Sequence, residues 1–212
     1  VGPIIRRSEV QILPPQPIVN YSIDTNRYCF LLYCSRGDYM LEKVRKYQLK
    51  HKNLKLIPIT TENYWEIGWL ELKKEQEEFV GDNFKSMAYA YATVMEGKYA
   101  KAFGIYDGDE SVGFLLIGHN SYDFEGCPET LKHSYDLWRI MIDKDYQNKG
   151  YGKDAVKLAL DYILTFPDGE EGIITTSYVE GNEVAKHIYE AFGFEPNGDN
   201  YEDEITLVLK VK

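Results

Sequence analysis

Apolar and polar positions follow regular periods only from about residue 54 onward. Short β-branched or alternating runs predict strands, and apolar positions three or four residues apart predict amphipathic helices. The expected strands cover residues 54–59, 100–106, 111–118, 136–142, 172–179 and 204–211. The expected helices cover residues 64–72, 83–95, 150–164 and the stretch between Asn182, a helix cap, and Gly193, a helix stop.

The order of these elements indicates an α/β domain with a central mixed sheet. A tight turn over residues 107–110 predicts an antiparallel hairpin. Thr60 and Thr61 are cap candidates for the first helix. In the helix that begins at Gly150, the apolar period places Lys153, Asp154, Lys157 and Asp161 on the side opposite the core.

Residues 1–53 lack this periodicity, and three prolines lie close together at positions 14, 15 and 17. We therefore expect two parts: a poorly ordered arm over residues 1–53 and a folded domain over residues 54–212. Met40 offers an alternative natural start, which would make the preceding residues a non-native extension.

Charge is distributed unevenly between these two parts. Residues 1–53 hold 9 basic and 4 acidic side chains, whereas residues 54–212 hold 15 basic and 30 acidic side chains. An acidic domain repels nucleic acid and anionic membranes and attracts a cationic amine, although solubility alone explains the same charge. The three cysteines form no disulfide or zinc pattern, and no apolar run approaches the roughly 20 residues that span a bilayer. We expect a cytoplasmic protein.

The sharpest local motif is the run from Gln147 to Lys153, which contains Gly150 and Gly152 and lies between a strand and a helix. Glycines allow close approach of the backbone, and the N–H groups at a helix start bind phosphate. Lys149 and Lys153 would supplement these groups. A turn without a ligand explains the same pattern. So does a dinucleotide fingerprint beginning at Gly150 with Glu180 as the ribose acid, but seven residues separate it from its strand.

A second motif follows this loop at a suitable spacing. It consists of Asn182 and the run from Ala185 to Phe194, and the strand 137–142 precedes the loop. Together these segments resemble the GCN5-related N-acetyltransferase (GNAT) family, most closely its bacterial diamine, spermidine and spermine acetyltransferases. The resemblance implies a three-layer acyl-CoA N-acyltransferase fold, a mostly antiparallel sheet flanked by helices, acetyl-CoA as acetyl donor and a primary amine as acceptor.

The resemblance also implies roles for individual residues. The strand before the loop would expose backbone to the pantetheine arm at Ile140, Met141 and Ile142, with the Ile140 N–H as oxyanion donor. Asn182 would lie beside that arm, and Tyr189 matches the general acid. The pyrophosphate would bind to Gln147, Asn148, Lys149, Gly150, Tyr151, Gly152 and Lys153.

Chemistry constrains the acid and the base. A phenol, with a pKa near 10, can donate to a leaving thiolate, although helix periodicity alone makes Tyr189 a core residue. An alkylamine of pKa about 10.4 is neutral only about once in 2,500 at pH 7, which costs roughly 4.6 kcal/mol, so a carboxylate base is needed. Asp136 is the candidate, with Glu78 and Glu180 as alternatives, and a solvated strand-end aspartate is the simpler interpretation.

Side chains suited to a polyamine are also available: Glu75, Glu77, Glu78, Trp69, Phe79, Tyr89 and Trp138. A solvated helix explains the glutamates equally well. His119, His133 and His187 show no metal-ligand spacing, and no metal is expected. Two other functions stay open, a protein or peptide N-acetyltransferase and a non-catalytic acyl-CoA sensor. Homodimers are usual in the resembling family.

Overall fold

The computed structural model describes residues 38–76, 79, 81–120, 122, 125, 127–201 and 204–211. The chain divides into two units, Val1–Tyr33 and Cys34–Lys212, of which the first lies outside the described residues. Seven strands form one sheet in the order β1-β2-β3-β4-β5-β7-β6. Their bounds are β1 Leu54–Pro58, β2 Tyr99–Asp107, β3 Glu110–His119, β4 Tyr135–Ile142, β5 Ile173–Val179, β6 Glu195–Tyr201 and β7 Glu204–Lys210.

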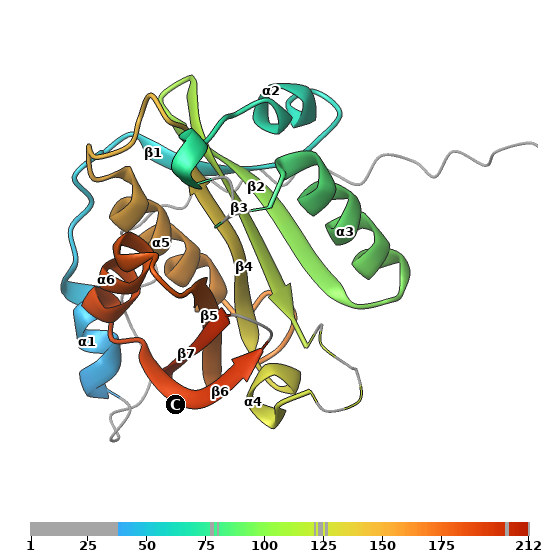
Figure 1. Cartoon of the computed structure of the whole chain (residues 1–212), viewed down its shortest axis with the longest axis vertical. Helices are drawn as coiled ribbons and strands as arrows, with labels where there is room; N and C mark the ends of the chain where they lie inside the picture. Colours follow the sequence, from blue (N-terminus) through green and yellow to red (C-terminus); the bar gives the residue numbers. More distant parts are fainter. Residues whose placement is uncertain are drawn as a thin grey trace, which may run out of the picture. The chain divides into compact units, whose positions relative to one another are not determined.

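Helices cover both faces of this sheet (Figure 1). On one face, α1 (Asp38–Lys46), α5 (Tyr151–Ile163) and α6 (Glu183–Phe192) contribute to the main apolar core. On the other face, α2 (Tyr64–Gly68) and α3 (Asn83–Met95) cover a smaller core. Two short elements, η1 (Lys74–Gln76) and α4 (Glu129–Lys132), lie in connections. The predicted fold class, a three-layer α/β arrangement around a mostly antiparallel sheet, is confirmed, because only β4 and β5 pair in parallel.

The helix predicted over residues 64–72 corresponds to α2 but is shorter than predicted. It ends at Gly68 rather than continuing to residue 72, and its N-cap is Asn63 rather than a threonine. The backbone of Glu71 is instead bound by the loop after β4: its N–H donates to the Asp143 carboxylate and its carbonyl accepts from the Lys144 N–H. These tertiary hydrogen bonds hold the chain away from the helical path.

The folded unit also begins earlier than expected. Residues 38–53 were assigned to the arm, but Leu41 and Val44 of α1 are buried in the main core. A nine-residue helix contributes only a few apolar positions, too few to establish a period in the sequence. The expectations for residues 1–37 lie outside the described residues.

Asp154 was wrongly assigned to the polar face of its helix. The residue is completely buried, because the chain after α1 covers the first turn of α5. Its carboxylate accepts hydrogen bonds from the Tyr47 hydroxyl (2.8 Å), the Lys50 N–H (3.1 Å) and the His51 N–H (2.8 Å), and lies 2.8 Å from His51 Nδ1. A hydrogen-bonded carboxylate therefore joins two segments distant in sequence.

Candidate active site

The sheet opens between its two parallel strands. β4 and β5 pair only at Tyr135 with Ile174 and at Asp136 with Thr175, and beyond these pairs the two strands separate. A cavity occupies the opening, bordered by β4, β5, the start of β7 and α6. Its lining residues are Phe79, Leu137, Trp138, Arg139, Ile140, Ser177, Tyr178, Val179, Asn182, Ala185, Tyr189 and Glu204. The predicted residues Ile140, Asn182 and Tyr189 therefore face one space.

The backbone of β4 presents polar groups to this opening. The Asp143 N–H donates to Val112 of β3, so alternation along the strand directs the Ile140 and Ile142 backbone away from β3. The Ile142 carbonyl is engaged by the Gln147 side-chain amide at 3.0 Å. Met141 differs, because its side chain is buried in the core on the face of α2 and α3. The Ile140 N–H therefore points toward the opening and away from β3.

The predicted phosphate loop ends at a helix start that has no side-chain cap. Asn148 and Gly150 have φ angles of 61° and 102°, which turn the chain into α5. Within the described ranges, no residue accepts a hydrogen bond from the backbone N–H of Gly150, Tyr151 or Gly152. Such free amides at a helix start, together with the helix dipole, suit an anion.

The side chains of this loop are used differently. Gln147 bonds to Gln76 and to the Ile142 carbonyl, so it shapes the loop rather than facing solvent. Lys149 Nζ donates to the Asp145 carbonyl at 2.7 Å, and Lys153 is exposed. Lys50, which sequence analysis missed, donates from Nζ to the Lys149 carbonyl at 2.7 Å. A third ammonium group therefore lies beside the free amides.

Tyr189 lies on α6, and Asn182 directly precedes that helix. The Asn182 side chain caps this helix by accepting from the Ala185 N–H at 3.1 Å. Tyr189 is only 4% exposed, and burial is the main reason that its pKa rises to about 12. The Thr176 side chain acts in the opposite direction, whereas the charges of Asp136 and Glu204 add to the rise. Tyr189 therefore keeps its proton throughout the neutral range.

Asp136 lies where the strand pairing ends. It is 6% exposed, and its carboxylate accepts from the Tyr122 hydroxyl at 2.8 Å and from the Thr175 hydroxyl at 3.0 Å. Burial raises the pKa of Asp136 to about 7, although both hydrogen bonds act to lower it. Nearby Glu204 raises this pKa further and Arg139 lowers it. A carboxyl group with a pKa near neutrality suits a general base.

The structure separates the residues proposed for an amine. Trp138 lines the cavity and contacts the rings of Tyr89 and Tyr122, with centroids 5.3 and 5.8 Å away. Trp69 belongs instead to an exposed aromatic group around Phe84. Glu75 and Glu180 are exposed and do not line the cavity, and Glu77 and Glu78 lie outside the described residues.

Three residues near Asp136 and Tyr189 were not identified as site residues from the sequence: Tyr122, Arg139 and Glu204. Tyr122 and Glu204 belong to no recognisable motif and approach Asp136 through the fold, whereas Arg139 lies on the same strand as Asp136 in a segment that the sequence singled out only for its backbone. Glu204 begins the last strand, which pairs with β5. An acidic strand start is ordinary, so the sequence carried no usable signal. No group of three or more His, Cys, Asp or Glu suited to a metal ion occurs among the described residues.

Comparison with known proteins adds to this geometry. Residues 98–196, which run from β2 into β6, match a family model described as an acetyltransferase (GNAT) domain. This part of the chain is similar to GNAT acetyltransferase domains. The matched residues include Asp136, the predicted phosphate loop and Tyr189, whereas α1 and α3 precede them.

Two curated relatives contain a similar segment. The spermine/spermidine N(1)-acetyltransferase of Bacillus subtilis (strain 168) is 32% identical over 106 residues, which are 49% of this chain and 65% of the relative. A probable spermine N(1)-acetyltransferase of Bacillus subtilis subsp. natto (strain BEST195) is 33% identical over the same length and the same shares. The chain thus spans slightly less than two thirds of these relatives.

Solved structures support the GNAT fold. Spermidine N-acetyltransferase from Vibrio cholerae in complex with CoA and spermine has a TM-score of 0.56 at 17% identity, covering 74% of this chain and 95% of that one. Aminoglycoside acetyltransferase AAC(6')-Ib in complex with coenzyme A has a TM-score of 0.59 at 17% identity, covering 74% and 94%. At these identities the likeness concerns the fold.

Proposed function

We propose that this chain transfers the acetyl group of acetyl-CoA to the primary amine of a small molecule, with polyamines as the favoured acceptor class. One observation carries the proposal: the cavity in the opening between β4 and β5 is lined by Ile140, Asn182 and Tyr189, and the buried Asp136 lies at the last rung before the two strands separate. The names of the two Bacillus subtilis relatives favour the polyamine class.

The phosphate loop and β4 fit the donor. The free N–H groups of Gly150, Tyr151 and Gly152 would hold its pyrophosphate, with Lys50, Lys149 and Lys153 nearby. The Ile140 N–H would stabilise negative charge that develops on the carbonyl oxygen. When bound, acetyl-CoA supplies the activated acetyl thioester. Gln147 and Asn148 stay predicted contacts of the pyrophosphate, and Ile142 and Asn182 stay predicted contacts of the pantetheine arm. Met141 was predicted to contact the arm as well, but it pairs with Phe114 of β3, so its backbone does not face the opening.

Asp136 would prepare the acceptor. The amine arrives as an ammonium ion and must lose a proton before nitrogen can form a bond to the acetyl carbon. With a pKa of about 7, Asp136 is about half ionised at pH 7 and can accept that proton directly or through water. The rings of Trp138 and Tyr89 would hold the cation by cation–π attraction.

Tyr189 would act on the leaving sulfur. Complete proton transfer from a phenol of pKa about 12 to a thiolate whose conjugate acid has a pKa of about 8.5 is unfavourable by roughly 5 kcal/mol. A hydrogen bond to sulfur that is gaining charge avoids this cost and still lowers the barrier. We therefore assign Tyr189 as a hydrogen-bond donor that stabilises the departing thiolate and keeps its own proton, while the acetylated nitrogen releases a proton as the carbon–sulfur bond breaks.

Replacing Tyr189 with Phe removes that donor and little else. We expect kcat to fall about 100-fold, while the Kd for CoA measured by calorimetry changes less than about threefold. The matched control is Tyr162→Phe, which removes a hydroxyl that pairs with Tyr99 in the main core. Full turnover by Tyr189→Phe would contradict the assignment.

The function itself is tested by two measurements on the full chain. Calorimetry should show CoA binding, and thiol release should show transfer to spermidine. No CoA binding would overturn the proposal. Transfer confined to short peptides would identify a protein N-acetyltransferase, and CoA binding without transfer to any amine would identify an acyl-CoA sensor.

Location and assembly are further parts of the proposal. None of the described helices has the length and apolar character needed to cross a membrane. The need for acetyl-CoA and the absence of a cysteine framework in the sequence support a cytoplasmic site of action. A dodecamer is described for the Vibrio cholerae spermidine N-acetyltransferase, which supports testing this chain for self-association, including the predicted homodimer.

A further inference from the structure

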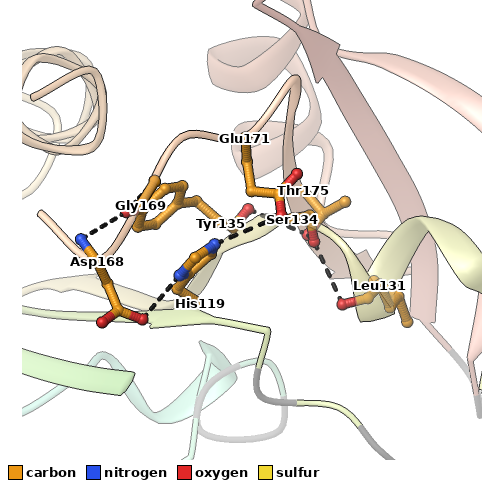
Figure 2. A network of polar contacts seen from close by, with 8 residues as sticks. All are labelled: His119, Leu131, Ser134, Tyr135, Asp168, Gly169, Glu171 and Thr175. Carbon is orange, nitrogen blue, oxygen red and sulfur yellow. Dashed lines mark hydrogen bonds and ion pairs between the residues drawn. The ribbon is translucent and has the colours of Figure 1, made fainter. Parts of the chain in front are cut away.

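Asp136 rests on a buried hydroxyl group that the proposed mechanism does not yet use. Thr175 of β5 is completely buried and pairs with Asp136 at the last rung before the two strands separate. Its hydroxyl lies 3.0 Å from Asp136 Oδ1, 3.0 Å from Ser134 Oγ and 3.3 Å from the Tyr135 carbonyl. Figure 2 shows Thr175 beside Ser134.

A threonine hydroxyl has one proton and can donate to only one of these three oxygens. When Asp136 is a carboxylate, Thr175 can donate to it and accept from Ser134. When Asp136 is protonated, its own O–H can donate to Thr175, which then donates to the Tyr135 carbonyl. Both protonation states of the base therefore have a complete set of partners.

Ser134 supports the same exchange. It is 1% exposed, and its hydroxyl lies 3.4 Å from the Leu131 carbonyl in addition to its contact with Thr175. It can thus donate to Thr175 in one arrangement and to Leu131 in the other. The carbonyls of Tyr135 and Leu131 are alternative acceptors for these two hydroxyls. The hydrogen bonds of Thr175 and Ser134 can therefore reverse direction by rotation of the hydroxyl protons, without movement of heavy atoms.

The Tyr135 carbonyl is firmly placed. The Tyr135 ring stacks on His119 with centroids 4.1 Å apart, and its hydroxyl donates to the Gly169 carbonyl at 2.9 Å. His119 is in turn 2.8 Å from the Asp168 carboxylate, as Figure 2 shows. These contacts hold the closed end of the β4–β5 opening together, and with it the geometry around Thr175.

We propose that Thr175, backed by Ser134, is a positioning residue that holds the Asp136 carboxyl in both protonation states and sets the pH at which it works as a base. The inference rests on the proposed function of Asp136. Other groups that face Asp136 are Tyr122, Arg139, Glu204 and Tyr189, so the hydroxyl pair is one of several influences on its titration.

The test is the pH profile of kcat/KM for the amine in Thr175→Val, an isosteric change that removes the hydroxyl. Because a hydrogen bond to the carboxylate is lost, the midpoint of the rise of kcat/KM with pH, which reflects ionisation of Asp136, should increase by about one pH unit. Activity should fall about tenfold at pH 6 and less than about twofold at pH 8.5. Thr175→Ser should restore the original profile, and Ser134→Ala should produce a smaller shift in the same direction.

Two further variants separate the outcomes. Thr165→Val removes a hydroxyl beyond the end of α5 that donates to the Tyr162 carbonyl, and its profile should match that of the unaltered protein. Asp136→Asn should abolish the rise of activity with pH altogether. If the rise of activity with pH persists in Asp136→Asn, Asp136 is not the base. If that rise is lost in Asp136→Asn but keeps its midpoint in folded Thr175→Val, only the present inference is overturned. A uniform loss of activity at all pH values in Thr175→Val also overturns it.

Discussion

Asp136→Asn should lower kcat for acetyl transfer by 100- to 10,000-fold, because the amide cannot accept the proton that the ammonium group must lose. The rise of kcat through about pH 7 in the unaltered protein should be absent in the variant, since that rise reflects ionisation of Asp136. Steady-state kinetics between pH 5.5 and 9 would measure both effects. The matched control is Asp109→Asn, which alters a fully exposed carboxylate in the β2–β3 turn and should leave kcat unchanged.

The same substitution should not weaken the fold. The pKa of Asp136 rises from 3.8 to about 7 on folding, so ionisation opposes the folded state as pH increases between these values. The loss in unfolding free energy reaches about 4 kcal/mol above pH 7. Asparagine escapes this cost, and urea unfolding at pH 8 should show the variant to be at least as stable as the unaltered chain. A variant that is inactive because it unfolds would not support the assignment.

Asp154→Ala should lower the unfolding free energy by about 3–5 kcal/mol. The change removes a completely buried carboxylate and leaves the Tyr47 hydroxyl and the Lys50 and His51 amides without their acceptor. Urea unfolding at pH 7 would measure it. Asp161→Ala on the same helix removes a partly exposed ion pair with Lys157 and should cost less than about 1 kcal/mol.

The pH dependence of this contribution has a definite sign. Burial by itself would raise the pKa of Asp154, but hydrogen bonds from His51, Lys50 and Tyr47 lower it overall. A lowered pKa means that the stabilisation is complete above the unfolded value near 3.9 and disappears as pH falls through the folded value. The difference in stability between the unaltered chain and Asp154→Ala should therefore shrink below about pH 4. A difference that stays constant from pH 7 to pH 2 would argue against this account.

The sequence was most informative where a segment is amphipathic and capped. The helix predicted over residues 83–95 has those bounds, and α6 is capped by Asn182 and stopped by Gly193, whose φ of 95° suits glycine. The hairpin of β2 and β3 was likewise evident from its turn. Each of these features depends on residues close together in the chain, which a local pattern can report.

Features created by tertiary contact were missed. β6 contains proline, glycine and asparagine and shows no alternation, yet it pairs with β7 at the sheet edge. The position of Asp136 was predicted, but its surroundings were not, because Tyr122, Thr175 and Glu204 come from three separate segments. Asp154 looked like a surface residue because its helix period gave no sign of the segment that covers it.

That covering segment links two distant parts of the chain. Tyr47 and His51 meet Asp154 across 107 and 103 positions of sequence. During synthesis α1 therefore leaves the ribosome long before α5 is made. The Asp154 carboxylate stays exposed to solvent until the segment that follows α1 docks onto the first turn of α5. Closing a span of this length is slow compared with local helix formation. We expect the joining of these two segments to be a late event in folding, completed after the central strands have paired.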